Sequence, residues 1–360
     1  MQIFILNTNF ETIAVVDSFI SLIWTDRYSE CGDFELVLSA NSEALTYIQI
    51  NYYIYLKESE HMMIVEETKL DTDVEDGDKV TITGRSLESI LDRRVVWGQT
   101  VVSGNLQENI KKLITDAIIN PKNESRKISN FKFKDATDTR ITSLTFEAQY
   151  FGDNLYDAIV AICKYYILGF KIVLNDNNEF VFELYVGNNR SYDQNNFAYV
   201  VFSPEYDNLL NSNYVCSVKE WKNVTMVAGS GELTSNRTIV GVGTTTGLDR
   251  REMYTDASSI SQSTDERTLS DSEYAQQLAT KGIQDLIKKV PSTAFEGETD
   301  TYGMYTYGVH YNIGDTVQIR NEYGMESKMY ISEFIFSEDS DGTKAYPTFI
   351  SLETLDEGDW

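Results

Sequence analysis

An arginine-rich fragment is the first place in this sequence where residue types and spacing suggest chemistry. Residues 84–97 read GRSLESILDRRVVW, which places Arg85, Arg93 and Arg94 around one short apolar helix. Guanidinium groups gathered in this way could bind a phosphate or a nucleic acid. An architectural interpretation competes with that one, because Arg93 and Arg94 fall in the last helical turn, where cations suit the negative end of the helix dipole.

The other residues of this fragment favour the architectural interpretation. Ser86 is a suitable N-cap, and Glu88 falls in the first turn, near the positive end of the dipole. Arg85 precedes the cap and can pair with acidic neighbours or with a partner chain. We therefore interpret Arg85, Arg93 and Arg94 as candidate interface residues rather than as phosphate ligands.

Residues for catalysis or metal binding are scarce. The chain has only His61 and His310, and we interpret each as a surface or turn residue. Cys31, Cys163 and Cys216 lie far apart, which predicts reduced thiols and neither a disulfide framework nor a zinc site. The sequence lacks a G-x-S-x-G elbow, and its Gly-rich stretches lack the lysine of a phosphate loop. We predict no catalytic site, no metal and no cofactor.

Tyrosines offer a different kind of chemistry. There are 23 of them, and the stretch YGMYTYG at 302–308 brings Tyr302 and Tyr305 close together. Such rings could stack on sugars, and they also fill strand faces and protein interfaces. Tyr302 and Tyr305 are therefore candidates for an interface or for a saccharide site.

The charge balance excludes some partners. The chain has 56 acidic and 30 basic residues in 360, a formal net charge of −26. Because attraction to phosphate needs a basic face, stable binding to DNA or to an anionic membrane is disfavoured. The N-terminal stretch MQIFILNTNF lacks a basic segment, and the most apolar helical stretch, 158–170, is short for a membrane span. We expect a soluble protein that is made in the cytoplasm.

The elements that must position these residues fall into four predicted domains. The predicted fold class is α+β, with strands in the majority. Residues 1–97 read as strands, exemplified by the alternation in GDFELVLSAN, and form a first antiparallel β-barrel. Residues 98–207 form a mixed α+β domain with two predicted helices. Asn105 caps the start of the first helix, and Gly169 caps the end of the second. Residues 208–235 and 300–360 form a second, discontinuous β-barrel. Residues 236–299 are a small inserted domain with one helix, which opens on Ser270 and Glu273 at capping-box spacing.

An internal repeat links the two predicted barrels. Ile50, Ile54 and Leu56 share their spacing with Ile313, Val317 and Ile319. Each set is followed by a Met-containing strand, MMIVEE or MYISEF, and then by an Asp-Gly turn and another strand. Any β-meander with such a turn has this pattern, so the alternative to duplication stays open. If the duplication is real, one chain carries two similar barrels.

Four stretches together resemble one protein family. WTDRYSECGDFELVL (24–38), GRSLESILDRRVV (84–96), VVFSPEYDNLLNSNY (200–214) and NIGDTVQIR (312–320) look like the tail-hub, or Gp37-like, proteins of long-tailed bacteriophages. Their order extends across nearly the whole chain.

The resemblance implies a structural protein at the virion tail tip, which is synthesised in the cytoplasm of the bacterial host. Hubs of this family are homotrimers whose two barrels alternate around the axis, so three chains match the sixfold tail tube. The implied partners are the distal tail ring protein, the tape-measure protein and other tail-tip proteins, with DNA only as transiting cargo. The trimer would close or gate the channel for DNA.

Two other functions stay open at this stage. Longer family members continue into peptidase or receptor-binding modules, whereas this sequence ends at DEGDW. A saccharide-binding tail-tip adhesin is the alternative that the tyrosines favour, and a peptidoglycan hydrolase is the third. The sequence does not separate phage, prophage and tail-derived bacteriocin.

Overall fold

A 13-stranded sheet is the largest element of the computed structural model, which describes residues 1–40, 46–73, 77–231, 236–264, 267–299 and 304–351. Its strand order is β14-β18-β21-β20-β3-β4-β7-β6-β5-β1-β2, and β19 and β13 attach through β20. The first half-sheet comprises β1 (Ile3–Leu6), β2 (Thr12–Val16), β3 (Ser21–Arg27), β4 (Asp33–Ser39), β5 (Tyr53–Leu56), β6 (Met62–Asp71) and β7 (Lys79–Ser86). The second half-sheet comprises β13 (Val201–Phe202), β14 (Asn211–Ser217), β18 (Ser292–Glu298), β19 (Thr316–Arg320), β20 (Glu326–Asp339) and β21 (Gly342–Ser351).

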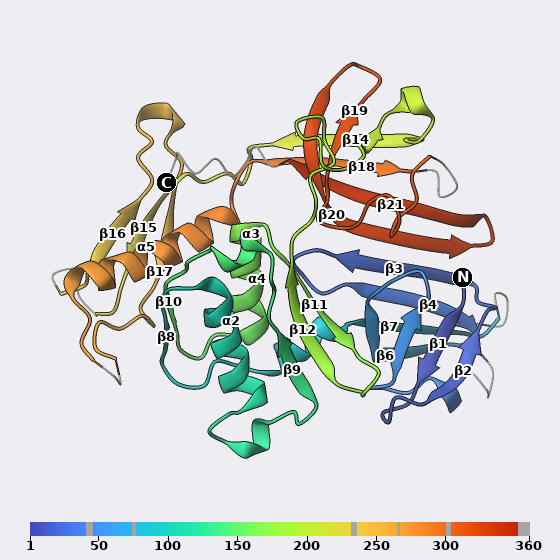
Figure 1. The fold of residues 1–360 in the computed structure, drawn as a ribbon, viewed down its shortest axis with the longest axis horizontal. Helices are drawn as coiled ribbons and strands as arrows, with labels where there is room; N and C mark the ends of the chain where they lie inside the picture. The colour runs from blue at the N-terminus through green and yellow to red at the C-terminus, as the bar shows by residue number, and fades with distance from the viewer. Residues whose placement is uncertain (41–45, 74–76, 232–235, 265–266, 300–303, 352–360) are drawn as a thin grey trace.

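The two half-sheets meet through β3 and β20. Residues 22–27 of β3 pair antiparallel with residues 333–338 of β20, so the blue and red strands of Figure 1 lie side by side. The predicted alternation in β4 is confirmed, since Phe34, Leu36 and Leu38 are buried and Glu35 is exposed. A continuous apolar cluster then extends through both halves, which joins them into one body.

The predicted repeat agrees with the strand pairing. β5, β6 and β7 form an antiparallel meander, and β19, β20 and β21 form another. Ile54 lies opposite Met63 in the first meander, as Val317 lies opposite Met329 in the second. Two closed barrels are not confirmed, because pairing among the described residues follows one open path from β14 to β2. The mostly-β character with additional helices is confirmed.

The segment after the first half-sheet is α+β. Its elements are η1 (Leu87–Arg93), β8 (Thr100–Val102), α2 (Leu106–Ile114), η2 (Thr115–Ile119), η3 (Glu124–Arg126), β9 (Phe131–Lys134), α3 (Thr139–Thr142), β10 (Ala148–Tyr150), α4 (Leu155–Tyr166), β11 (Gly169–Leu174), β12 (Phe180–Tyr185) and η4 (Pro204–Tyr206). β12 pairs with β11 and β9 in one small sheet, and β8 pairs with β10 in another. Asn105 caps α2, as predicted, because its side chain accepts a hydrogen bond from the Glu108 amide.

Gly169 has a different role from the predicted C-cap. α4 ends at Tyr166, and Ile167 takes the left-handed conformation that ends the helix, with φ of 50°. Gly169 starts β11, where a Cβ atom would lie 2.4 Å from the Tyr28 ring and 2.5 Å from the Tyr185 ring. Close packing of two distant tyrosines therefore requires glycine there, and the prediction from local capping was wrong.

The remaining elements form a small sheet with one long helix: β15 (Val224–Ala228), β16 (Ile239–Val242), η5 (Gly247–Asp249), β17 (Glu252–Asp256) and α5 (Asp271–Ile287). The capping box of Ser270 and Glu273 is confirmed at the start of α5. This unit docks on the α+β segment, where buried Gln149 exchanges hydrogen bonds with the backbone of Ser261. Among the described residues, no helix is long and apolar enough to span a membrane.

Candidate functional site at the junction of the half-sheets

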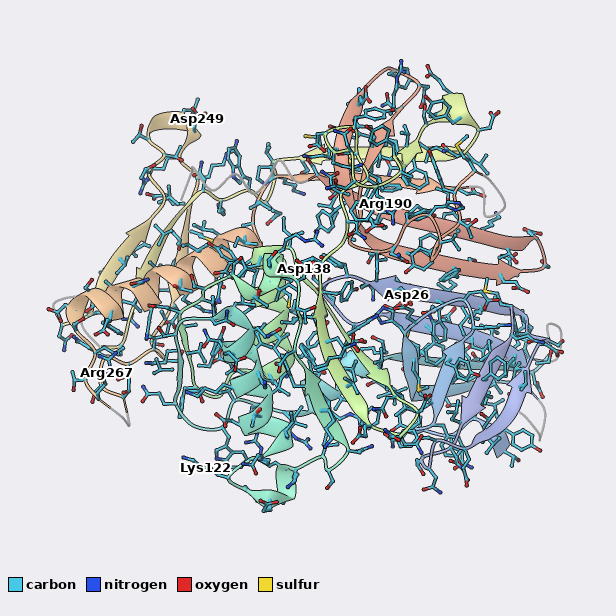
Figure 2. The ribbon with its side chains drawn as sticks, in the orientation of Figure 1. Asp26, Lys122, Asp138, Arg190, Asp249 and Arg267 are labelled. Atoms are coloured by element: carbon cyan, nitrogen blue, oxygen red, sulfur yellow. The ribbon has the colours of Figure 1, made fainter. Side chains whose placement is uncertain are left out.

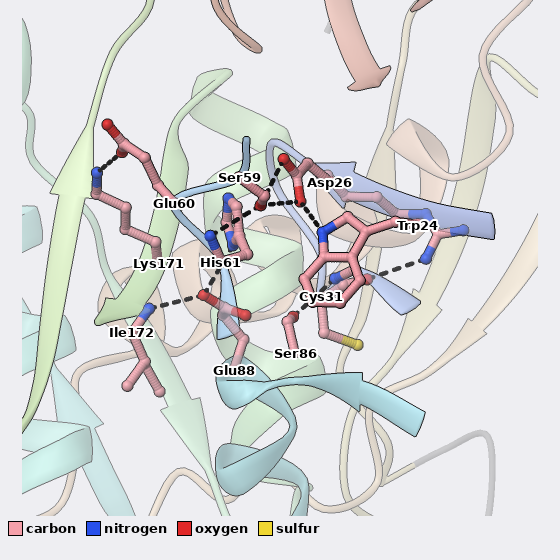
Figure 3. A network of polar contacts seen from close by, with 12 residues as sticks. Trp24, Asp26, Cys31, Ser59, Glu60, His61, Ser86, Glu88, Lys171 and Ile172 are labelled. Carbon is pink, nitrogen blue, oxygen red and sulfur yellow. Dashed lines mark hydrogen bonds and ion pairs between the residues drawn. The ribbon is translucent and has the colours of Figure 1, made fainter. Parts of the chain in front are cut away.

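A buried charged network lies beside the junction of the two half-sheets (Figure 3). It joins Asp26 of β3, His61 just before β6, and Glu88 of η1, and all three side chains are almost completely shielded from solvent. His61 Nδ1 lies 3.4 Å from Glu88 Oε1. Asp26 accepts hydrogen bonds from Trp24 Nε1 at 3.0 Å and from Ser59 Oγ at 2.8 Å. The network thus ties three separate segments of the chain together.

The network also reaches the α+β segment. The backbone amide of Ile172, in β11, donates to Glu88 Oε1 at 2.7 Å. Ser59 Oγ accepts from the backbone amide of His61 at 3.0 Å. Buried charges persist in proteins when they are paired and hydrogen-bonded. Asp26 and Glu88 Oε1 accept hydrogen bonds, whereas His61 Nδ1 and Glu88 Oε2 are buried without a hydrogen-bond partner among the described residues.

Each charge in this network shifts the protonation of the others. Burial opposes a charge on His61, but Asp26 and Glu88 outweigh it and raise the pKa of His61 to about 9. Burial is also the largest effect on Asp26 and raises its pKa. Burial alone would raise the pKa of Glu88. The charge of His61 and hydrogen bonds from His61, Ser86 and the Ile172 amide outweigh burial and lower that pKa. His61 is therefore an imidazolium at neutral pH.

A protonated His61 is not in the state that a general base needs. A general base must have a free ring nitrogen to accept a proton, and an imidazolium has none. The Ser59 hydroxyl donates to Asp26 and meets His61 only through its backbone amide, so the geometry of an activated serine nucleophile is not formed. The arrangement stabilises a junction.

A second polar cluster seals the pairing of β3 with β20. Arg27 donates to Glu333 Oε1 at 2.8 Å, to Asp33 Oδ2 at 2.6 Å and to the carbonyl of Cys31 at 3.1 Å. The amide of Tyr28 donates to the carbonyl of Ser332 at 3.0 Å, which extends the pairing past the end of β3. One guanidinium thus bridges both half-sheets.

The NIGD stretch forms a third cluster, where the α+β segment meets the second half-sheet. Asp315 is buried and accepts from Arg190 Nε at 2.7 Å and from the amide of Asn188 at 2.6 Å. Gly314 has φ of +85°, and a Cβ atom there would lie 2.2 Å from the Tyr28 ring. Asp26 and Arg190 lie near the meeting line of the half-sheets, whereas Lys122 and Arg267 lie at the periphery (Figure 2).

The three predicted arginines are engaged within their own chain or exposed. Arg85 donates to both carboxylate oxygens of Glu66, at 2.7 and 3.0 Å, and to Asp92 at 2.9 Å. Arg94 follows the last residue of η1, and it donates to the carbonyl of Arg93 at that helix end at 2.9 Å and to the carbonyl of Arg126. Arg93 is exposed in the last turn. A role of any of them between chains stays a proposal.

One expectation for this fragment was wrong and another was confirmed only in position. Ser86 makes no capping hydrogen bond, because its hydroxyl accepts from the amide of Gly32 at 2.8 Å instead. Glu88 lies in the first turn, as predicted, but it is buried there, and its contacts with His61 and the Ile172 amide are tertiary.

Of the two predicted tyrosines, Tyr305 is among the residues that the structure describes. Tyr305 is half-buried against Phe202, with ring centroids 5.9 Å apart, and its hydroxyl accepts from the Val201 amide at 3.4 Å. Tyr302 lies outside the described residues. His310 is an exposed turn residue, as expected, and its Nδ1 accepts from the amide of Thr306.

His61 is the clearest residue that sequence reasoning placed wrongly. It was expected at the surface, but only 5% of it is exposed, and two carboxylates from distant segments face it. Nothing within a few residues of His61 shows those partners. The family motifs gave an indirect hint, because Asp26 and Glu88 both fall inside them, in WTDRYSECGDFELVL and GRSLESILDRRVV.

Comparisons with known proteins agree on the fold. The tail protein from Neisseria meningitidis MC58 has a TM-score of 0.57 at 12% identity, covering 98% of this chain and 97% of that one. The 43 kDa tail protein of prophage MuSo2 from Shewanella oneidensis has a TM-score of 0.58 at 13% identity, covering 99% and 100%. Prophage tail protein gp18 from Listeria monocytogenes EGD-e has a TM-score of 0.52 at 13% identity, covering 99% and 97%.

No curated protein matches this sequence. The model of the Siphovirus ReqiPepy6 Gp37-like protein family matches residues 2–349, nearly the whole chain. This match agrees with the resemblance that the four sequence motifs carry, and the chain belongs to the Siphovirus ReqiPepy6 Gp37-like protein family.

Proposed function

We propose that this protein is a structural component of a phage tail that acts, without turnover, as a trimeric hub at the tail tip. Its family and the shared fold of the phage tail proteins support the assignment to a tail. The polar residues of the family motifs hold the junctions of the fold together, as Arg27 and Asp315 do. Polar residues that hold the fold together suit a structural protein that works by assembling with other chains.

The repeated meander is the observation that carries the hub. Two half-sheets with similar strand order in one chain give six similar units in three chains. Six units suit the sixfold symmetry of a tail tube, to which the distal tail ring protein would connect them. Homo-oligomers favour closed rotational symmetry, and a trimer is the smallest ring that provides six units here.

The net charge supports a role in the passage of DNA. A charge of −26 would give a central channel a negative wall if acidic side chains line it. Such a wall repels phosphate and prevents DNA from adhering during transit. We propose that the closed trimer retains the tape-measure protein and opens to let DNA pass.

Imaging of the purified protein tests the hub directly. Light scattering is expected to give the mass of three chains, and negative-stain images are expected to show a threefold ring with a central hole. A compact particle of one chain at all concentrations would overturn the trimer. A ring with a basic or neutral lumen would overturn the proposed role of the charge.

A saccharide-binding adhesin is the second candidate, and exposed tyrosines favour it. Tyr192 and Tyr199 are 49% and 42% exposed, and their ring centroids lie 5.5 Å apart. Exposed aromatic faces at this spacing can stack on sugar rings. Binding on a glycan array that Tyr192→Ala abolishes would support the adhesin, and no binding by the wild-type protein would exclude it for the glycans tested.

A further inference from the structure

A groove on the α+β segment brings together cations and an exposed tryptophan. Trp97 lies four residues after η1, Lys112 lies in the last turn of α2, Lys122 precedes η3 and Arg126 ends it. Lys122 marks this region at the periphery of the molecule in Figure 2. The groove encloses a volume of about 380–430 Å³ at most, with 430 Å³ for the whole of it. Small-molecule sites typically have volumes of about 300–1,000 Å³.

The cations in this groove differ from most others in the chain. Most lysines and arginines form an ion pair with a carboxylate. Lys112 Nζ instead donates to the carbonyl of Val101 at 3.0 Å, and Arg126 donates to the carbonyl of Val95 at 2.6 Å. Lys122 is exposed and forms no ion pair within the described part of the chain. These three cations therefore lack a full counter-charge.

Such a gathering of cations stands against the charge of the whole chain. The net charge is −26, so carboxylates are abundant as partners, yet they do not pair with the cations of this groove. The neighbouring Arg94 shows the local excess of positive charge, because burial and then the charges of Arg126 and Arg93 lower its pKa. Cations that lie together without carboxylate partners provide a favourable site for an anion.

Trp97 gives the groove an aromatic wall. Its side chain is 70% exposed, and the guanidinium carbon of Arg126 lies 4.9 Å from the centroid of its ring. A guanidinium stacked in this way orients the indole and covers only one of its faces. The other face is available to pack against the ring of a ligand.

Asp116 adds a hydrogen-bond acceptor to the groove. α2 continues at Thr115 into η2, a single π-helical turn, and Asp116 on this turn lines the groove. Single π-turns occur often at functional sites. A carboxylate repels a bare phosphate but accepts hydrogen bonds from hydroxyl groups. Asp116 therefore favours a ligand that carries hydroxyl groups as well as a negative charge.

We propose that this groove binds a saccharide that carries a phosphate group. Lys112, Lys122 and Arg126 bind the phosphate through charge-assisted hydrogen bonds. Trp97 packs against the sugar ring, and Asp116 accepts hydrogen bonds from its hydroxyl groups. A free sugar phosphate and a polymer of phosphorylated sugar units share this chemistry. The site lies within one chain and does not depend on the trimer of the proposed function.

Isothermal titration of the full-length protein at low salt tests the ligand class. The probes are glucose 1-phosphate, glucose 6-phosphate, glucose and inorganic phosphate. We expect at least one sugar phosphate to bind about tenfold more tightly than glucose or inorganic phosphate, because only the sugar phosphates engage both the cations and Trp97. Equal binding of inorganic phosphate would overturn the saccharide, and no binding of either sugar phosphate would overturn the site.

A pair of lysine variants locates the phosphate. Lys122→Gln removes an exposed ammonium group without breaking an ion pair among the described residues, so the fold should persist. We expect it to weaken binding of the sugar phosphate about tenfold. Lys57→Gln is the matched control, because Lys57 is also exposed and lies in the first half-sheet, outside the groove. Equal weakening by both variants would show a general effect of charge and overturn the site.

A pair of tryptophan variants locates the sugar ring. Trp97→Ala should weaken binding of the sugar phosphate severalfold and leave the binding of inorganic phosphate unchanged. Trp221→Ala is the control, because Arg251 stacks on Trp221 at the same 4.9 Å but neither residue lines the groove. Equal loss of both ligands in Trp97→Ala would contradict the stacking of a sugar ring.

Removing Asp116 separates a sugar site from a simple anion site. Asp116→Ala removes the repulsion that inorganic phosphate meets, so we expect inorganic phosphate to bind more tightly. The same variant loses an acceptor for hydroxyl groups, so the preference for the sugar phosphate should fall severalfold. An unchanged preference would contradict the role of Asp116.

Two larger probes distinguish the source of the ligand. A glycerol phosphate polymer that carries glucose should bind more tightly per phosphate than the sugar phosphates if the source is a polymer, and equally if the source is a free sugar phosphate. A single-stranded oligonucleotide also presents phosphates and rings. Tighter binding of the oligonucleotide than of every sugar probe, with a loss in Lys122→Gln, would overturn the saccharide in favour of a nucleic acid.

Discussion

The two half-sheets share a strand order but have different interiors. The first half-sheet contains a buried charged network, in which His61 lies near Asp26 and Glu88. The second is filled by aromatic rings, among which Tyr307 and Phe334 stack with centroids 3.9 Å apart. The backbone pairing is similar in both, down to the position of the bulge in β6 and β20.

This difference teaches that backbone register and core chemistry are separable in this fold. Strand order depends on which backbone edges meet, whereas the interior needs only to be filled and its polar groups paired. The charged network makes a contribution to folding stability that depends on pH, whereas packing of the aromatic rings does not. The predictions below separate the two halves on that basis.

The largest effect is expected from His61→Ala. Removing the imidazolium leaves the Asp26 and Glu88 carboxylates buried without a cation, and breaking buried pairs in this way costs roughly 3–5 kcal/mol. Urea denaturation measures the loss of unfolding free energy. His310→Ala is the matched control, because His310 is exposed, and it should change stability by less than about 1 kcal/mol. Equal effects of the two variants would contradict the charged network.

The pH dependence of stability separates the two halves most directly. The pKa of His61 is about 9 in the folded chain, above its ordinary value of 6.5. The contribution of protonated His61 to the free energy of unfolding is complete below pH 6.5 and is lost as pH rises through 9. This contribution amounts to about 3 kcal/mol. Denaturation of the wild type across this range should show the fall, and His61→Gln should not.

The aromatic half supplies the control for this measurement. Phe334→Leu leaves a cavity beside Tyr307 and should destabilise the protein by on the order of 1–2 kcal/mol. Because no charged group is removed, we expect the same loss at pH 6.5 and at pH 9. A loss that varies with pH would mean that the two interiors are not independent.

Replacing Arg27 tests the junction between the halves. Arg27→Ala removes hydrogen bonds to Glu333 and Asp33, and hydrogen bonds to charged groups contribute about 1.5–3 kcal/mol. We expect a loss of about 2 kcal/mol in denaturant unfolding. Lys328→Ala, which breaks an exposed ion pair with Asp193, should cost less than about 1 kcal/mol. Similar losses would show that the junction does not depend on Arg27.

The smallest effect on folding is expected from Arg85→Ala. Arg85 binds Glu66 and Asp92 at a partly exposed site, where such pairs contribute about 0.5–1 kcal/mol. Glu66 lies at the bulge of β6, and we propose that Arg85 contributes to a contact between copies, so we expect the trimer to weaken more than the monomer. Light scattering across a dilution series measures this, with exposed Arg93→Ala as control. Unchanged assembly would remove Arg85 from the interface.

Sequence reasoning succeeded where a few neighbouring residues decide the structure. Asn105 and the pair of Ser270 and Glu273 were recognised as caps because the donor and acceptor lie within three residues of each other. The meander repeat was visible for a similar reason, since spacing within and between adjacent strands is a local property.

Sequence reasoning failed where distant segments meet. Gly169 looked like a helix cap, but Tyr28 and Tyr185 determine its role. His61 looked like a surface residue, but Asp26 and Glu88 surround it in the interior. In each case a partner far along the chain competed with the local interpretation and prevailed.

The sequence by itself determined the acidic character, the mostly-β class with a helical segment, the main helix caps and the paired meanders. These follow from composition and from spacing within single elements. Only the tertiary structure decided that His61 is buried between Asp26 and Glu88, that β20 joins β3, and that Gly169 packs against Tyr28 and Tyr185. The physical reason is that burial and edge pairing depend on which distant strands meet, and no local pattern in the chain encodes that contact.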